Sequence, residues 1–347
     1  MISRGAIVQP ALRFDETTAD WVIFAPSRSL RPHEFRQPGS ADADQSGLSN
    51  VCPFCPGNEW MTPQEIYAEH PPVGSTARWS VRVFPNKFPA LRIEEDHKRH
   101  ETPDGFRYLG GCGAHEVIVE SPDHDRLLCE QPVEQIERVL STAQRRYQDL
   151  MRDPRFQTVV VFKNHGERAG TSLRHPHWQL IATPVVPHLL RLKHQVATEY
   201  FDRTGDCLYC IMAQRELECE HRILSHNDEF VAILPFASHA PFETWILPKH
   251  HHSSFERHPR EQLRALAELL QLVLLRLHQG LDNPDFNLTI DAVARGDESK
   301  EYFLWHLRII PRITTAAGFE LGSGMSINTI LPEEAAAYLR ELELERS

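Results

Sequence analysis

Two histidines and a glutamine occupy alternate positions in the segment His175-Pro176-His177-Trp178-Gln179. If this segment is a strand, the alternation places all three polar side chains on one face. A neutral imidazole can attack phosphorus or bind a metal, and a glutamine amide can hold a phosphate oxygen. A solvent-facing polar face is the alternative. Because Pro176 cannot donate a ladder hydrogen bond, we expect a strand at a sheet edge or an irregular one.

A glycine-punctuated loop, residues 164–172, precedes these histidines and contains Gly166 and Gly170. Small residues let backbone N–H groups approach an anion closely, as they do in phosphate-binding loops. An ordinary glycine turn has the same composition, so the loop by itself is weak evidence. Next to the histidines, it favours an anion site over a merely polar strand face.

Four of the seven cysteines form two Cys-x-x-Cys pairs, Cys52 with Cys55 and Cys207 with Cys210. An odd number of cysteines is a poor disulfide framework, and this usage indicates metal ligands in a reducing compartment. A Cys-x-x-Cys pair can instead be redox-active. Prolines that stiffen the first turn, together with the unusually many histidines, favour a metal there.

The composition excludes several classes of protein. The chain has 347 residues, of which 41% are hydrophobic and 24% charged, so it is globular and long enough for two domains. Its net charge of −11 argues against a nucleic-acid or anionic-membrane partner, although a local basic pocket could still bind a small phosphorylated substrate. The chain has no run of 18 apolar residues, and residues 1–14 lack the apolar core of a secretion signal. We therefore expect a cytoplasmic protein.

The elements that must position these residues follow the same order twice. Strands are predicted at residues 21–24, 80–84, 116–120, 158–162, 175–181, 230–234, 243–247, 286–290 and 303–310, and helices at 132–151, 259–278 and 332–345. The spacings repeat as well, since 51 residues separate His124 from His175 and 55 separate His251 from His306. This duplication predicts two similar α+β halves, residues 1–195 and 196–347, each with an antiparallel sheet and helices.

Taken together, the motifs resemble the active-site signature of the galactose-1-phosphate uridylyltransferases, the transferase branch of the histidine-triad superfamily. The matching string is Asn164…Gly170-x-Ser172…His175-Pro-His177-x-Gln179. Residues 21–32, 52–55, 121–124 and 241–249 extend the resemblance over nearly the whole chain. It implies two tandem histidine-triad-like halves, bound zinc and a homodimer.

The resemblance also implies a ping-pong mechanism. His177 would attack the α-phosphorus of a nucleoside diphosphate sugar, and the resulting nucleotidyl-histidine would pass its nucleotide to a phosphate-bearing acceptor. Gln179 would hydrogen-bond a non-bridging phosphate oxygen. The implied substrate contacts are Asn164, Gly170 and Ser172 at phosphate or nucleotide, Asn86 near the ribose, and Arg28 and Arg31 at substrate phosphate.

Zinc ligands carry over from the family in the same way. The implied first set is Cys52, Cys55, His124 and His175. Four ligands leave no open position, so this zinc would be structural and would anchor the strand that bears His177. His115 is the alternative third ligand.

A second zinc is less well defined. Its implied ligands are Cys207, Cys210, His251 and His306. Plant-type members of the family place a histidine where this chain has Leu304, and His306, two residues on, would share its strand face. Two free cysteines are the alternative. The family's acidic iron ligand falls at Lys193, so we expect no iron site.

The segment 318–328 resembles plant-type relatives that release ADP from ADP-glucose with inorganic phosphate as the acceptor. The main prediction is therefore a hexose-1-phosphate uridylyltransferase-like enzyme that uses UDP-glucose, and an ADP-glucose phosphorylase-like enzyme is the alternative. A histidine-triad nucleotide hydrolase and a zinc-stabilised protein without catalysis are two further alternatives.

Overall fold

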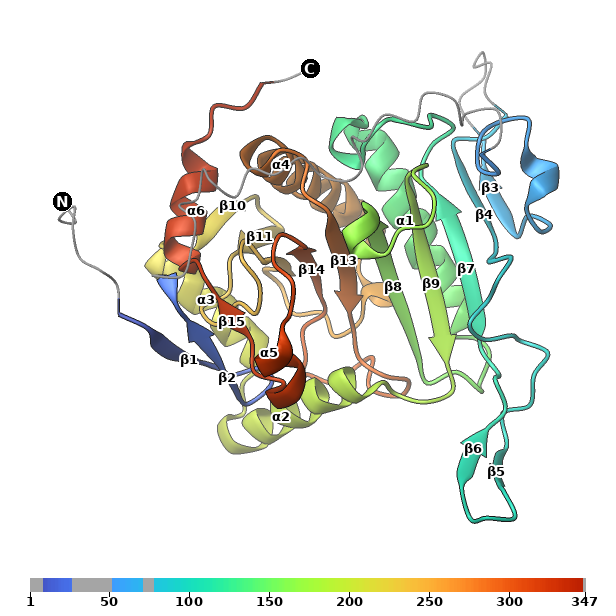
Figure 1. Ribbon diagram of the computed structural model, residues 1–347, viewed down its shortest axis with the longest axis horizontal. Helices are drawn as coiled ribbons and strands as arrows, with labels where there is room; N and C mark the ends of the chain where they lie inside the picture. The colour runs from blue at the N-terminus through green and yellow to red at the C-terminus, as the bar shows by residue number, and fades with distance from the viewer. Residues whose placement is uncertain (1–8, 27–51, 71–77, 346–347) are drawn as a thin grey trace.

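The computed structural model describes residues 9–26, 52–70 and 78–345. At its centre lies a ten-stranded sheet with the strand order β10-β11-β12-β14-β13-β8-β9-β7-β4-β3 (Figure 1). The strands of this sheet are β3 (Tyr67–Glu69), β4 (Val81–Pro85), β7 (Ala114–Val119), β8 (Thr158–His165), β9 (His177–Thr183), β10 (Ile223–His226), β11 (Phe230–Ile233), β12 (Thr244–Pro248), β13 (Phe286–Asp291) and β14 (His306–Pro311). All neighbouring strands in it are antiparallel.

The sheet consists of two five-stranded halves with the same internal order. The first half reads β3-β4-β7-β9-β8 and the second β10-β11-β12-β14-β13, and they meet where β8 pairs with β13. This confirms the predicted α+β fold with antiparallel sheets. The two sheets are not separate, however, because the β8–β13 hydrogen bonds join them into one.

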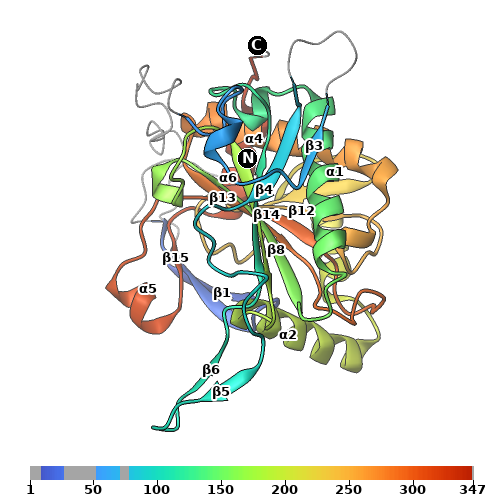
Figure 2. The same ribbon diagram turned by 90° about the vertical axis from the view of Figure 1, so that its right-hand side faces the viewer.

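The helices are α1 (Val133–Leu150), α2 (His188–Thr204), α3 (Leu208–Cys219), α4 (Leu263–Leu281), α5 (Gly318–Ser323) and α6 (Pro332–Glu341). The long helices α1 and α4 lie side by side on one face of the sheet (Figures 1 and 2). The predicted boundary between residues 195 and 196 falls inside α2. Whether each half is an independent domain stays a prediction.

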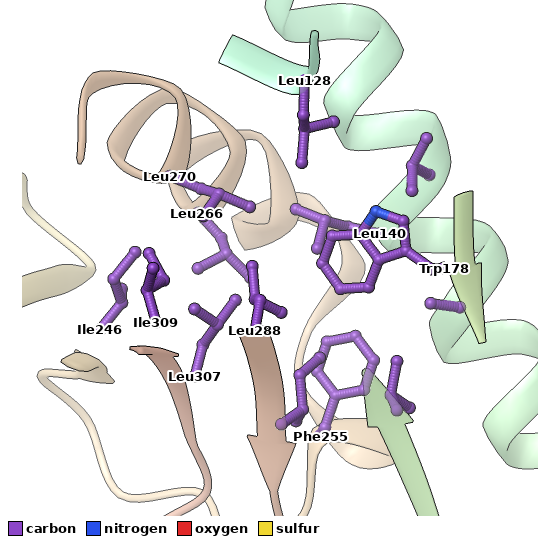
Figure 3. Close-up of a cluster of buried hydrophobic side chains, with 14 of the residues drawn as sticks. Leu128, Leu140, Trp178, Ile246, Phe255, Leu266, Leu270, Leu288, Leu307 and Ile309 are labelled. Atoms are coloured by element: carbon purple, nitrogen blue, oxygen red, sulfur yellow. The ribbon is translucent and has the colours of Figure 1, made fainter. Parts of the chain in front are cut away.

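Apolar periodicity accounts for the position of α1 and α4. In α1 the buried side chains recur at helical spacing, at Ile136, Val139, Leu140, Ala143 and Tyr147, and so form one stripe that faces the sheet. The core beneath the two helices is shared by both halves of the chain. Figure 3 shows side chains of α1, α4, β9, β12, β13 and β14 meeting in this single cluster.

The N-terminal strands pack on the second half, although the predicted division assigned them to the first. Strands β1 (Ala11–Asp15) and β2 (Asp20–Phe24) form a hairpin, and β2 pairs in parallel with β15 (Ile327–Asn328). Arg13 adds an ion pair of 3.1 Å to Glu333 at the start of α6. Strand pairing and charge thus hold the N-terminal hairpin on residues that come late in the chain.

A second hairpin, β5 (Arg99–Glu101) with β6 (Arg107–Leu109), projects away from the sheet (Figures 1 and 2).

Among the described residues, no helix has the length and apolar character needed to cross a bilayer.

We predict that Leu288→Ala destabilises the whole sheet. Leu288 lies on β13 at the junction of the halves and is fully buried, so truncation leaves a cavity that costs about 3 kcal/mol. Urea denaturation should show one cooperative transition with a lower midpoint. Leu12→Ala, at an exposed position, is the control and should change stability by less than about 0.5 kcal/mol. Unfolding of the second half at a lower urea concentration than the first half would contradict a shared core.

Candidate active site and metal centres

The strand that carries His177 is central in the sheet. β9 lies between β8 and β7, so of the two expectations for this strand the edge position is wrong and the irregularity at Pro176 is confirmed. The proline is tolerated because β9 begins only at His177, and Pro176 precedes the regular ladder. The Pro176 carbonyl still accepts a 3.2 Å hydrogen bond from the Glu120 N–H.

Side chains of β9 alternate between two different environments. Trp178 and Leu180 point into the core beneath α1 and α4, as Figure 3 shows for Trp178. His177 and Gln179 therefore lie on the opposite face, as predicted. His175 precedes the strand. Its carbonyl contacts the His177 ring, and its own ring belongs to the first metal cluster.

His177 has a defined tautomer. Its Nδ1 lies 2.9 Å from the His175 carbonyl oxygen, which can only accept, so Nδ1 carries the proton. Nε2 then holds a lone pair, and no contact among the described residues engages it. Burial lowers the pKa of His177 to about 4, and Lys163 adds to the effect. Phe54 packs edge-on against the ring at 5.2 Å and limits its motion.

Two further polar side chains converge on Gln179. The His115 Nε2 lies 2.7 Å, and the Asn86 Nδ2 3.4 Å, from the Gln179 Oε1. His115 therefore lies beside Gln179 and away from the cysteine thiols, so the alternative of His115 as a metal ligand is wrong. Asn86, predicted near a ribose, lies on the same face of the sheet as His177.

The glycine loop is held in place by the second half of the chain. Gly166 has a positive φ of 82°, and a Cβ there would overlap the Asp285 carboxylate, which accepts a 2.7 Å hydrogen bond from the Arg168 N–H. Gly170, also at positive φ, ends the 3-10 turn Glu167–Ala169, while Ser172 is exposed beyond it. These contacts fix the loop beside His177.

Asn287 on β13 is a site residue that the sequence alone did not reveal. It lies opposite Asn164 in the β8–β13 register and donates 2.9 Å to the Asn164 Oδ1 and 2.8 Å to the Ala169 carbonyl. Asn164 is thus left with its NH2 group for a ligand. The signal was weak because Asn287 is a single polar residue in a strand otherwise predicted only by its apolar pattern.

Four predicted ligands of the first metal site come together. The ligand atoms of Cys52, Cys55, His124 and His175 all lie within 4.8 Å of one another. The Cys55 Sγ lies 3.2 Å from the His124 Nδ1 and 3.6 Å from the His175 Nδ1, while the Cys52 Sγ lies 3.8 Å from the same His175 atom.

This geometry fits a tetrahedral metal ion. Zinc bonds of about 2.3 Å to sulfur and about 2.0–2.1 Å to nitrogen imply S···N separations of about 3.6 Å. The His175 Nε2 lies 2.8 Å from the Ser121 carbonyl and must donate to it, so the Nδ1 lone pair faces the thiols. Burial and the neighbouring Cys52 raise the pKa of Cys55 to about 12, a penalty that a bound cation would relieve.

The second cysteine pair gathers one histidine rather than two. Cys207, Cys210 and His251 form a three-residue cluster in which the Cys210 Sγ lies 3.3 Å from the His251 Nδ1. His306 is not part of this cluster, which corrects its prediction as the fourth ligand. A hydrogen bond with Cys210 lowers the pKa of Cys207 to about 5, so a thiolate is available there.

The correction has a simple structural cause. His306 begins β14 as His177 begins β9, and its Nδ1 donates 3.0 Å to the Leu304 carbonyl two residues earlier. His306 therefore corresponds to His177, and Leu304 corresponds to the ligand His175. His306 is therefore two residues beyond the position of the fourth ligand, and this chain has Leu304 at that position.

His306 is sealed from solvent in its half. Its ring stacks on Trp245 at 4.7 Å and on Tyr209 at 4.9 Å, and it is fully buried. Asp291 beside it binds the Lys193 Nζ at 2.6 Å. Burial and Lys193 lower the pKa of His306 to about 3, so it stays neutral.

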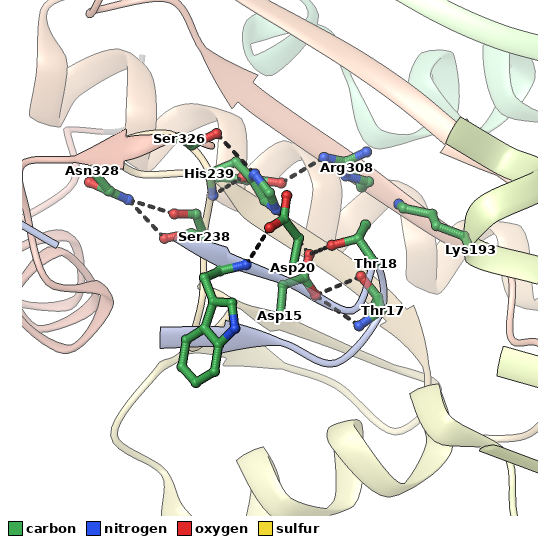
Figure 4. A network of polar contacts seen from close by, with 12 residues as sticks. Asp15, Thr17, Thr18, Asp20, Lys193, Ser238, His239, Arg308, Ser326 and Asn328 are labelled. Carbon is green, nitrogen blue, oxygen red and sulfur yellow. Dashed lines mark hydrogen bonds and ion pairs between the residues drawn. The ribbon is translucent and has the colours of Figure 1, made fainter. Parts of the chain in front are cut away.

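The surrounding ion pairs extend to the N-terminal hairpin. Arg308 contacts Glu243 at 2.9 Å and Asp291 at 3.5 Å. Figure 4 shows Arg308 in the same network as His239, whose Nε2 lies 2.9 Å from Asp15 on β1. The family resemblance places an acidic iron ligand at the position of Lys193. In this chain the position therefore has an ammonium group instead of a carboxylate.

Arg28 and Arg31, predicted at substrate phosphate, lie outside the described residues. Their roles stay predictions.

Comparisons with known proteins agree with this arrangement. A family model described as galactose-1-phosphate uridyl transferase, N-terminal domain, matches residues 3–187, and a model of a domain of unknown function matches residues 127–345. An ADP-glucose phosphorylase of Arabidopsis thaliana is 34% identical over 96% of this chain and 93% of its own length. A galactose-1-phosphate uridylyltransferase of Thermotoga maritima is 27% identical over 96% and 99%.

Solved structures show the same relationship. The crystal structure of the Arabidopsis thaliana ADP-glucose phosphorylase with bound ADP-glucose superimposes with a TM-score of 0.80 at 31% identity, covering 97% of this chain and all of that one. A uridylyltransferase structure gives a TM-score of 0.72 at 26% identity, covering 96% of this chain and 97% of that one. The fold and its relatives define a nucleotidyltransferase. The chain belongs to the galactose-1-phosphate uridylyltransferase family.

We predict that Cys52→Ser lowers metal content and stability together. Loss of one ligand should remove about one metal ion per chain and lower Tm by roughly 5 °C or more, because a metal in this cluster would tie the cysteine turn to the segment that ends at His177. Elemental analysis and calorimetry measure the two effects. Cys219→Ser, at an exposed cysteine outside both clusters, is the control. Metal loss with an unchanged Tm would contradict a structural role.

Proposed function

We propose that the chain transfers a nucleotide from a nucleoside diphosphate sugar to a phosphate-bearing acceptor through a covalent nucleotidyl-His177 intermediate. The Nε2 lone pair of His177 attacks the α-phosphorus, an N–P bond forms, and the bond to the bridging oxygen breaks as the hexose 1-phosphate leaves. An acceptor phosphate oxygen then attacks the same phosphorus, and the N–P bond breaks.

The observation that carries this proposal is the tautomer of His177. The His175 carbonyl holds the proton on Nδ1 and so aims an unprotonated Nε2 away from the backbone. Desolvation keeps the ring neutral, which a nucleophile requires. Attack at phosphorus would place positive charge on the ring, and the same carbonyl would stabilise the charged N–H.

Fixed donors around His177 suit the phosphoryl group. Gln179 lies on the same face, and Asn164 has its Oδ1 engaged by Asn287, which leaves its amide NH2 for a phosphate oxygen. Donors held in place before the reaction stabilise developing charge at little reorganisation cost.

We propose zinc as the metal of the first cluster. Two thiolates and two imidazoles in a closed tetrahedral set are typical of structural zinc sites. Zinc at this place would supply folding energy and rigidity. The cluster of Cys207, Cys210 and His251 offers three ligands, which is compatible with zinc whose fourth ligand is water or another small molecule.

Two donor and acceptor pairs are candidates. UDP-glucose with a hexose 1-phosphate acceptor follows from membership of the uridylyltransferase family. ADP-glucose with inorganic phosphate is favoured by the 34% identity to the ADP-glucose phosphorylase and by the segment 318–328, which resembles plant-type relatives. A homodimer, in which Arg28 and Arg31 meet substrate phosphate, is part of the proposal.

The first test is intact-protein mass after incubation with UDP-glucose or ADP-glucose without an acceptor. We expect a gain of one nucleoside monophosphate with one of the two donors, and its mass identifies the base. His177→Ala should give no adduct and lower turnover by about 10³-fold or more, because no other group forms the intermediate. Its metal content and Tm should match the wild type. A retained adduct in this variant would disprove the mechanism.

A phosphate-free assay separates the hydrolase alternative. Release of free nucleoside monophosphate at the transferase rate, without an acceptor, would show that water is the acceptor.

The pKa of His177 gives a prediction for pH. With a pKa of about 4, the ring remains about 90% unprotonated at about pH 5. The single-turnover rate of adduct formation should therefore stay constant from about pH 8 to about pH 5.5 and fall only below that. Rapid-quench kinetics measure this rate. A fall centred near the ordinary histidine pKa of about 6.5 would show that the nucleophile is not desolvated.

A further inference from the structure

The amide of Gln179 has two chemically different ends. Its Oε1 accepts hydrogen bonds and its Nε2 donates them, whereas a phosphate oxygen can only accept. Gln179 can therefore assist the proposed nucleotide transfer only when Nε2 faces the phosphate. A rotation of 180° about the terminal bond would present a carbonyl oxygen to an anion and repel it.

A chain of hydrogen bonds from the backbone determines which end faces where. The Ala90 N–H donates to the His115 Nδ1 at 3.2 Å. Because a backbone N–H can only donate, this contact leaves the His115 Nδ1 unprotonated and places the ring proton on Nε2. The His115 Nε2–H then donates to the Gln179 Oε1 at 2.7 Å.

Asn86 is oriented by the same logic. The Phe88 N–H donates 2.9 Å to the Asn86 Oδ1, so the Asn86 Nδ2 is turned toward the Gln179 Oε1, 3.4 Å away. The Asn86 Nδ2 and the His115 Nε2 lie 3.2 Å apart, and since both are donors they converge on the same oxygen. No contact among the described residues engages the Gln179 Nε2.

His115 is well placed to keep this arrangement. It lies on β7 opposite Ile181, one diagonal step from Gln179, and is partly buried. Desolvation lowers its pKa, so it stays neutral. In an imidazolium the His115 Nδ1 would also carry a proton, and two N–H groups would then face each other at Ala90. The contact with the Ala90 N–H therefore favours the neutral ring.

We propose that His115 is a positioning residue: by donating from Nε2 to the Gln179 Oε1, it holds the amide so that its NH2 group faces the transferred phosphoryl group. This role rests on the proposed function. The same device recurs at Asn164, whose Oδ1 is held by Asn287, so both amides on this face present donors. His115 itself touches neither the substrate nor the reacting atoms in this scheme.

The test is a double-mutant cycle with His115→Phe, Gln179→Ala and the double variant. Phenylalanine keeps a planar ring and removes the donor. We expect the rate of His177 nucleotidylation to fall about tenfold in His115→Phe, since the amide is then free to rotate, and further in Gln179→Ala. The double variant should match Gln179→Ala, because a residue that acts only through Gln179 has no further effect without it.

Rescue and controls separate positioning from a general structural role. His115→Gln retains a side-chain N–H donor and should recover part of the rate lost in His115→Phe. Metal content and Tm should be unchanged in all variants. A wild-type rate in His115→Phe, or additive losses in the double variant, would overturn the proposal.

A substrate-free measurement distinguishes failure of this proposal from failure of the proposed function. ¹⁵N NMR of the full protein, with the His115 signals assigned by their loss in His115→Gln, should show a neutral ring protonated on Nε2 near neutral pH. An Nδ1–H tautomer or an imidazolium would overturn the positioning role. The absence of any wild-type adduct, with the expected tautomer present, would refute only the proposed transfer.

Discussion

The antiparallel pairing of β8 with β13 is the contact on which the rest of the structure depends. It joins two five-stranded halves into one sheet and allows α1 and α4 to share a single core. It also places Asp285 and Asn287, from the second half, against the glycine loop of the first. The loop beside His177 is therefore set by a strand more than a hundred residues later, and the site is built from both halves.

The duplication has preserved backbone geometry while the two sites have diverged. His177 and His306 each begin a strand and each donate from Nδ1 to a carbonyl two residues earlier. Around His177 the neighbours are amides and a glycine loop, and Nε2 is left for chemistry. Around His306 the neighbours are stacked aromatic rings and buried ion pairs, which stabilise the attachment of the N-terminal hairpin and leave no access.

Control of polarity is the feature that links the metal centre to the candidate active site. Backbone carbonyls fix the tautomers of His175 and His177, and backbone N–H groups fix the orientations of His115 and Asn86. Backbone groups have an invariable donor or acceptor character, so each side chain next to them is left with one defined function. The cluster of Cys52, Cys55, His124 and His175 includes the ring of the residue that supplies this carbonyl to His177, so a metal bound there would anchor the segment.

Local pattern in the sequence was sufficient for α1, α4, α6 and most strands of the large sheet, and for the residues that could do chemistry, but it did not predict α2 or α3. Alternation placed His177 and Gln179 on one face, and apolar spacing located α1 and α4. The Cys-x-x-Cys spacing indicated a metal site, and the family resemblance supplied its two histidines. These properties depend on residues close together in the chain or on donor types that few other side chains offer.

Tertiary structure alone decided which strands pair, because pairing depends on long-range packing. It moved residues 11–24 onto the second half and made β9 a central strand. It also showed that Leu304, which cannot bind a metal, stands at the position expected for the fourth ligand, and that His306 does not. It placed His115 beside Gln179 and Asn287 beside Asn164. A shift of two residues keeps a side chain on the same strand face, so alternation cannot detect it, whereas a metal or a hydrogen bond requires a match within a few tenths of an ångström.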